Sequence, residues 1–344
     1  MASVEVFLDQ MPGETRGIIA RDGLYHHLVI QRETDRPCDR LGAVLVGRAV
    51  RVEPALRGAF VDLGYGEPYG FLPLGQKSQV GEGARVEVEV TAEPRESKGP
   101  VLRLIGPATT ESGLVRAGPG VAEILGRLAP RAVVQEGMLA VRAAMEAEEE
   151  ALTTVFQDQA TGLDLAVERT RALVSVDIDH RPLPGREGRK AREAVNWAGL
   201  VHTARILSLK GWGGLVVIDM VGTNLHGETV TRSVRTAFAA EAELAVGPLS
   251  RFGLMQLSLP WRRRPIEERL AKSGPCRGLE TRALRLVREL NHALLTDLAT
   301  ARLAILASPE EATAALPYIE RLGPRAHVVA DAALGPGQFK IKEA

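Results

Sequence analysis

From residue 162 onward the sequence alternates between short apolar segments and longer amphipathic ones, and this alternation limits the folds available to the chain. Segments such as GGLVVIDMV and RLAILAS have the length and composition of buried strands, whereas REGRKAREAVNWAGLVHTARILSLKG and ETRALRLVRELNHALLTDL have helical periodicity. Strands that alternate with helices favour an α/β fold, because each helix can cover one face of a sheet. We therefore predict an α/β core over 162–270 and a small α+β domain over 271–344.

Residues 36–107 have a different character. They contain five short strand-like segments separated by Gly and Pro, namely AVLVGRAVRVEP, RGAFVDLG, YGFLPL, ARVEVEVTAEP and PVLRLIG. This pattern predicts a small closed β-barrel, for which the OB-fold is a common solution. Residues 1–35 contain two or three further strands, which we expect to pack on the α/β core. The Ala- and Glu-rich stretch 108–161 is predicted to be a helical connector, with a solvated amphipathic helix over 138–158.

Charge balance and cysteine usage narrow the class of protein. Lys and Arg together number 43, as do Asp and Glu, so any nucleic-acid surface must come from local clustering of cations. Cys38 and Cys276 lie far apart and form no CxxC pair, which favours a reducing compartment over a disulfide framework. The N-terminus lacks the pattern of a secretory signal and no apolar run reaches membrane-spanning length, so we expect a cytoplasmic protein without a membrane partner.

Two aspartates interrupt apolar strand-like segments: Asp177 in ALVSVDID and Asp219 in GGLVVIDMV. Burying an unpaired carboxylate costs several kcal/mol, so a strand rarely carries one without a partner. At strand ends in an α/β sheet two such carboxylates can converge and share a divalent ion such as Mg²⁺. Asp179 lies two residues beyond Asp177 and faces the same side of a regular strand. The alternative is that these aspartates lie just past the strands and cap turns or helices.

The order of several motifs resembles that of the ribonuclease E/G family. VERTRALVSVDID, then GGLVVIDM, then SRFGLMQLS is similar to the family's catalytic domain, which implies an RNase H/DNase I-like α/β core. The segment RVEPALRGAFVDLGYGEPYGFLPL is similar to the family's S1-type RNA-binding domain, and the segment GPGQFKI to its small terminal domain. These motifs occur in the family's order over most of the chain.

The resemblance implies a Mg²⁺-dependent endoribonuclease in which Asp177 and Asp219 hold the metal and Asp179 lies beside them. Its substrate would be single-stranded RNA, cleaved to a 3′-hydroxyl and a 5′-phosphate. The resemblance also implies RNA contacts from Phe60 and Phe71, because exposed rings on an OB surface stack on unpaired bases. The alternative for both rings is ordinary barrel core.

Further RNA contacts are expected outside these motifs. Lys98 in RESKGP matches a basic S1 position, and Arg251 lies in SRFGLMQLS. Asn196 in VNW matches a TNL pattern near the family's site. Arg263, one of three consecutive arginines after Trp261, can clamp the RNA backbone or belong to a solvated basic loop.

Arg232 and Arg235 share a helix face after the second aspartate, which suits either phosphate contact or surface salt bridges.

Four departures from the family pattern bear on function. Asp179 replaces an Asn, and an ionised carboxylate cannot donate a hydrogen bond to phosphate. Ser273 replaces the first cysteine of the family's zinc-link, so any homo-oligomer is expected to form without that link. His180 replaces a small hydroxyl residue and is either a proton shuttle or a solvated loop histidine. The stretch that holds the family's 5′-monophosphate pocket is shortened, with Ala117 where a Thr is usual.

Two other functions compete with the enzyme. A non-catalytic RNA-binding protein would keep the fold without turnover, and a cleavage assay with and without Mg²⁺ separates it from the enzyme. A structural or regulatory protein acting through its helical segment 130–160 would show no salt-dependent RNA affinity, whereas either RNA-binding function predicts affinity that falls with salt.

Overall fold

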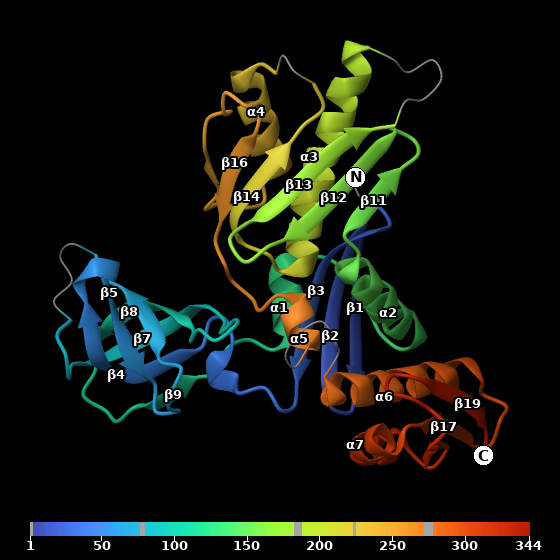
Figure 1. Cartoon of the computed structure of the whole chain (residues 1–344). Helices are drawn as coiled ribbons and strands as arrows, with labels where there is room; N and C mark the ends of the chain where they lie inside the picture. The colour runs from blue at the N-terminus through green and yellow to red at the C-terminus, as the bar shows by residue number, and fades with distance from the viewer. Residues whose placement is uncertain (1–2, 76–79, 182–187, 223–224, 272–277) are drawn as a thin grey trace. The chain divides into compact units, whose positions relative to one another are not determined.

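The computed structural model of the 344-residue chain falls into two compact units, each described here by itself (Figure 1). One unit comprises residues 1–148 and 263–344, and the other comprises residues 149–262. No helix among the described residues is both long and apolar enough to cross a membrane. The described residues are 3–75, 80–181, 188–222, 225–271 and 278–344.

The unit 149–262 is built on a six-stranded mixed sheet in the order β11-β12-β13-β14-β16-β15. Helices α3 (Arg189–Lys210) and α4 (Gly227–Ala237) lie on one face of this sheet, and none of this unit's described residues forms a helix on the other, open face (Figure 1). Apolar side chains from the strands and the two helices form a single buried cluster on the covered face. The strands are β11 Val155–Asp158, β12 Leu163–Arg169, β13 Val174–His180, β14 Gly214–Asp219, β15 Ala245–Val246 and β16 Met255–Leu259.

The boundaries of these elements follow local chemistry. Helix α3 ends where Gly211 adopts a left-handed conformation, with φ of 69°, and donates its N–H to the carbonyls of the last turn.

The helix predicted over 138–158 is wrong at its C-terminal end. Helix α2 spans Met138–Leu152, and the residues VFQD form β11, which pairs with the edge of β12. Cross-strand pairing of these β-branched and aromatic residues outweighs continuation of the helix.

Residues 44–107 form a closed five-stranded barrel. The strand order β5-β6-β8-β7-β4 closes on itself through the β4–β5 pairing, and β9 (Gly113–Arg116) adds to β4. Short turns η1 (Pro37–Asp39) and η2 (Pro54–Leu56) flank β4. Together with the α/β core, this barrel confirms the predicted fold class. The barrel strands are β4 Val44–Glu53, β5 Gly58–Asp62, β6 Gly70–Pro73, β7 Arg85–Ala92 and β8 Val101–Pro107.

The N-terminal residues form a sheet of their own in the order β10-β1-β2-β3. Helix α1 (Val121–Leu128) packs its apolar face on this sheet, and the packed side chains form a separate small core. That these strands pack on the α/β core stays a prediction. The strands are β1 Val4–Met11, β2 Glu14–Arg21, β3 Leu24–Arg32 and β10 Val134–Gln135.

The C-terminal part is a small α+β layer, as predicted. Helices α6 (Leu279–Thr296) and α7 (Pro309–Ile319) cover a three-stranded sheet in the order β18-β17-β19. The remaining elements are α5 Ile266–Leu270, η3 Glu320–Leu322, β17 Leu303–Ala307, β18 Ala326–Ala330 and β19 Phe339–Glu343.

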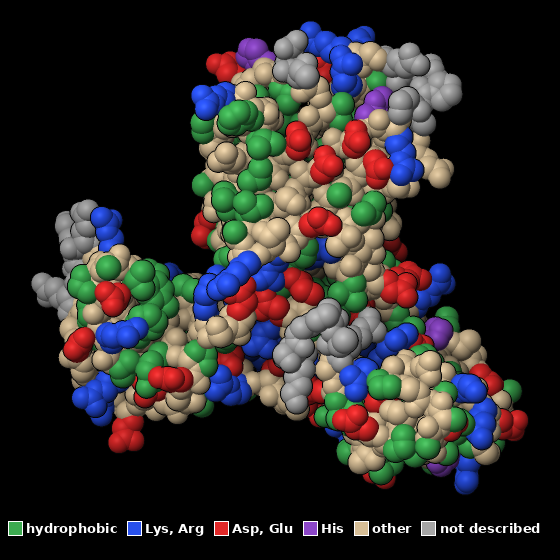
Figure 2. Space-filling view, in the orientation of Figure 1, with side chains coloured by type: hydrophobic (Ala, Val, Ile, Leu, Met, Phe, Trp, Pro, Cys, Tyr) green, Lys and Arg blue, Asp and Glu red, His purple; other side chains and the backbone are tan. Residues whose placement is uncertain are grey.

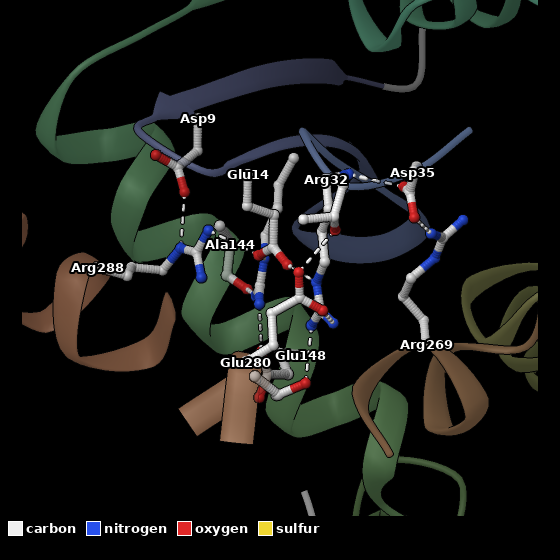
Figure 3. Close-up of polar contacts among 12 residues, drawn as sticks. Asp9, Glu14, Arg32, Asp35, Ala144, Glu148, Arg269, Glu280 and Arg288 are labelled. Atoms are coloured by element: carbon white, nitrogen blue, oxygen red, sulfur yellow. Dashed lines mark hydrogen bonds and ion pairs between the residues drawn. The ribbon is translucent and has the colours of Figure 1, made fainter. Parts of the chain in front are cut away.

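A buried ion-pair network connects these parts of the larger unit (Figure 3). The side chain of Glu14, which is 0% exposed, accepts hydrogen bonds from Arg16 at 2.8 Å, Arg32 at 2.8 Å and Arg288 at 3.0 Å. These arginines come from β2, β3 and α6. They also bond to carboxylates around Glu14, which are Asp9, Glu148 and Glu280.

Candidate active site

The two predicted carboxylates lie side by side on the open face of the six-stranded sheet. Strands β13 and β14 are parallel neighbours, and Asp177 is the register partner of Asp219. The preceding pair, Val176 and Ile218, is buried in the core on the helix-covered face. Because side chains alternate along a strand, both aspartates project from the opposite face, with backbones about 4.8 Å apart. The alternative that they cap turns or helices beyond the strands is wrong, since both lie within their strands.

Two more carboxylates extend this pair along the sheet. Asp179 is exposed and shares the face of Asp177, as predicted from the two-residue spacing. Asp164 on β12 is the antiparallel register partner of Asp179. Arg181 binds the Asp164 carboxylate at 2.7 Å and also bonds Gln157 at 3.1 Å. Asp164, the carboxylate on β12, is therefore already paired with a cation.

Like charges concentrate on this face. Figure 2 shows several red carboxylates together over the β12–β14 region, next to one blue side chain. Desolvation raises the pKa of the Asp177 carboxyl, and the neighbouring charges of Asp179, Asp219 and Asp164 raise it further. Within the described part of the chain, no three His, Cys, Asp or Glu side chains are arranged to hold one metal ion jointly. The face therefore offers a pair of carboxylates, Asp177 and Asp219, with no ion-pair partner among the residues that the structure describes.

Asn196 on α3 holds the backbone that follows Asp219. Its side-chain amide donates to the carbonyl oxygen of Val221 at 2.9 Å, and its oxygen accepts the Val221 N–H at 2.9 Å. Both polar ends of the amide are thus bonded to one residue, two positions beyond Asp219. The prediction that Asn196 neighbours the site agrees with this geometry, but the contact observed is structural, and its predicted RNA contact stays a prediction.

The position of His180 is not that of a solvated loop histidine. The residue lies within β13, next to Asp179, and is half-buried. Strand alternation directs its side chain to the face opposite the carboxylates. A proton shuttle between His180 and the carboxylate face is therefore not supported.

The predicted barrel contacts lie in the larger unit. Phe60 and Phe71 are register partners on β5 and β6, with ring centroids 5.6 Å apart in an edge-to-face arrangement. Their sequence neighbours Val61 and Leu72 fill the barrel core, so the two half-buried rings lie on the outer surface. The barrel-core alternative for these rings is wrong. Arg51 lies over the Phe60 ring, 4.4 Å from its centroid.

Lys98 lies in a different part of the barrel, in the turn between β7 and β8. Its ammonium is exposed, 3.7 Å from the Glu96 carboxylate. A pair this exposed contributes little to stability, so the ammonium can exchange its partner for a phosphate.

The three consecutive arginines of PWRRRP have protein neighbours. Arg262 pairs with Glu241 at 2.9 Å, and Arg264 donates to the Pro94 carbonyl at 3.0 Å. Burial lowers the pKa of His27 to about 3, and the charge of the half-buried Arg263 lowers it as well. The predicted RNA clamp by Arg263 stays a prediction.

Arg251 is exposed on the turn before β16, with its guanidinium 5.0 Å from the centroid of the Phe252 ring. On α4, Arg232 and Arg235 are also exposed, and neither forms the surface salt bridge that the sequence allowed with any described residue. These three guanidinium groups belong to the same unit as the paired carboxylates.

Two residues used in the sequence analysis lie outside the described residues, and one carboxylate of the site was not predicted. Ser273 and Cys276, on which the zinc-link argument rests, lie outside the described residues. Asp164 was not predicted, although the alternation in GLDLAVER places it on the polar side of its strand. Its partnership with Asp179 depends on strand register, which local sequence does not contain.

Part of the chain that includes this sheet matches a known protein family. Residues 131–264 match the sequence model of the Ribonuclease E/G family. The match spans both strands that carry the paired aspartates, together with α3 and the turn before β16. No curated protein matches the chain.

Proposed function

We propose that this protein is a Mg²⁺-dependent endoribonuclease that cleaves single-stranded RNA, because residues 131–264 match the sequence model of the Ribonuclease E/G family. One observation carries the proposal: Asp177 and Asp219 are register partners on adjacent parallel strands and project from the open face of the sheet. The reaction would be hydrolysis of an internal phosphodiester bond, leaving a 3′-hydroxyl and a 5′-phosphate.

The residues present suit a magnesium ion. Mg²⁺ binds proteins through one or two carboxylates and keeps several waters, so a pair of aspartates is a sufficient ligand set. Desolvation and the neighbouring carboxylates raise the pKa of Asp177, and a bound cation would relieve both effects. Asp164 is the carboxylate that Arg181 already occupies, so Asp177 and Asp219 are the ligands we propose. When bound, such an ion supplies an activated water and neutralises charge on the phosphate.

The remaining parts of the site would position the ligands and the RNA. Asn196 holds the backbone after Asp219 through its two hydrogen bonds to Val221, and this contact would help to position that carboxylate. Asp179 stands where an Asn is usual, and its charge would repel phosphate unless a cation lies between them. The exposed rings of Phe60 and Phe71 and the ammonium of Lys98 would bind flanking RNA.

The proposal is tested by cleavage of a labelled, unstructured oligoribonucleotide with MgCl₂ and with EDTA. The variant Asp219→Asn should abolish Mg²⁺-dependent cleavage while keeping the tryptophan emission of the native protein. Glu168→Gln is the matched control, because Glu168 is an exposed carboxylate on the same open face but farther along β12. Unchanged cleavage by Asp219→Asn would refute the assignment, and RNA binding without cleavage by the wild type would indicate a non-catalytic RNA-binding protein.

A further inference from the structure

One aromatic side chain in the unit 149–262 is exposed to solvent on a turn that is closed by hydrogen bonds. Phe252 is 76% exposed, and fully burying a Phe side chain is worth about 1.5–3 kcal/mol that this position forgoes. The turn around it is closed by its own hydrogen bonds, because the Ser250 hydroxyl accepts the N–H groups of Phe252 at 3.3 Å and Leu254 at 3.1 Å. Gly253, with φ of +83°, completes the turn and donates its N–H to the Ser250 carbonyl at 3.0 Å. These hydrogen bonds hold the backbone of the turn in a conformation in which the ring points into solvent.

This turn lies at the end of the sheet where Asp219 stands. Strand β16 begins at Met255, whose antiparallel register partner on β14 is Ile218. Asp219 follows Ile218 and is therefore adjacent to Leu254, at the end of the turn. Since residues rise about 3.4 Å along a strand and strands lie about 4.8 Å apart, Phe252 is within roughly 10 Å of the Asp219 backbone.

One cationic group contacts the exposed ring, and two more line a groove beside the preceding residues of the turn. The Arg251 guanidinium lies over the Phe252 ring, 5.0 Å from its centroid. Because the Phe252 side chain is still 76% exposed, a base can stack on the part of the ring that Arg251 does not cover. On the other side of the turn, Pro248 and Leu249 form one wall of an open groove of about 870 Å³. Helix α4 forms the opposite wall, and its charged lining residues are Arg232, Arg235 and, in its first turn, Glu228. Neither of these two guanidinium groups has an ion-pair partner among the described residues.

We propose that Phe252 is a stacking platform for an unpaired base near the cleaved bond, and that the α4 groove, on the helix-covered side of the sheet, receives phosphates farther along the same strand. The inference rests on the proposed function for its choice of ligand. A flat, exposed ring with a guanidinium group beside it suits a nucleotide, because the base needs a stacking surface and its phosphate needs a cation. The required substrate feature follows: the nucleotide at this position must be unpaired, since a base within a duplex cannot present its face to the ring.

The first test measures binding of a fluorescent, unstructured oligoribonucleotide in EDTA, so that no cleavage is needed. Phe252→Ala should weaken binding by about 5- to 150-fold, the range for losing one base–aromatic stack. Phe252→Trp should keep the affinity, and its added indole should be quenched by the oligonucleotide. Leu298→Ala is the matched control, because Leu298 is 79% exposed, lies in the other unit and should leave the affinity unchanged.

A second measurement separates stacking from charge. Arg232→Gln and Arg235→Gln should each lower the slope of log affinity against log salt by about 0.7, the value for one contact to single-stranded phosphate. Phe252→Ala should leave that slope unchanged. An oligonucleotide with abasic positions has no base to stack, so wild type and Phe252→Ala should bind it with the same affinity.

The outcomes distinguish this inference from the proposed function. Normal affinity in Phe252→Ala would overturn the inference even if the wild type cleaves RNA. Weakened affinity in Phe252→Ala, together with no cleavage by the wild type, would support the stacking platform and reject the enzyme. A change in oligomeric state of Phe252→Ala, without a change in RNA affinity, would assign the exposed ring to a protein interface and overturn the inference.

Discussion

Replacing Glu14 by Gln should strongly destabilise the unit formed by residues 1–148 and 263–344. The Glu14 side chain is fully buried and accepts hydrogen bonds from Arg16, Arg32 and Arg288 (Figure 3). Burial by itself would raise the pKa of the Glu14 carboxyl, but the three arginines outweigh burial and hold that pKa well below its usual value. Glutamine keeps the size but removes the negative charge and turns an N–H group toward other N–H groups.

The expected loss in the free energy of unfolding follows from the burial of these charges. Removing one partner of a buried ion pair costs about 3–5 kcal/mol, because the remaining charges lose their compensation. With a urea slope of about 2–3 kcal/mol per molar for a unit of this size, the midpoint should fall by roughly 1–2 M. The exposed pair of Glu123 and Arg127 on α1 provides the control, and Glu123→Gln should cost less than about 0.5 kcal/mol.

The assay can separate the two units. All three tryptophans, Trp197, Trp212 and Trp261, lie in the unit 149–262, so their fluorescence follows that unit. Far-UV circular dichroism follows the unfolding of the whole chain, so the lower urea midpoint expected for Glu14→Gln should be visible in this signal. The difference between wild type and Glu14→Gln should be greatest near neutral pH and shrink as the pH falls below the usual carboxyl pKa of 4.5. A loss under about 1 kcal/mol at neutral pH would refute the argument that Glu14 compensates the buried arginines.

Two further predictions concern the carboxylate face. Because desolvation and like charges raise the pKa of Asp177, its ionised form destabilises the fold above that pKa, and Asp177→Asn should raise the free energy of unfolding at pH 7 by about 0.2–1 kcal/mol without metal. The gain should vanish as the pH falls through the raised pKa and reverse with added Mg²⁺, which binds the wild type better; tryptophan-monitored urea unfolding would measure both effects. Asn196→Ala should cost about 1–3 kcal/mol and slow cleavage, because the backbone of Val221 loses both hydrogen bonds; normal cleavage kinetics would exclude a positioning role.

Local sequence was sufficient for the pattern of elements around the candidate site. Alternation in VSVDID puts Asp177 and Asp179 on one face, and the structure has them there, because side-chain direction along a strand has a period of two. The apolar residues of GGLVVID predict the strand that carries Asp219, and the glycine after LSLK predicts the end of α3. These features depend on near neighbours in the chain, and the sequence therefore contains them.

Tertiary structure decided which side chains meet. The parallel pairing of β13 with β14 brings Asp177 beside Asp219, and the antiparallel pairing of β12 adds Asp164. Pairing with β12 also makes a strand of VFQD, which had been predicted as helix. The exposed ring of Phe252 reaches the carboxylate end only through the register of β16. Register depends on which distant surfaces become buried together, a quantity that no local pattern of residues contains.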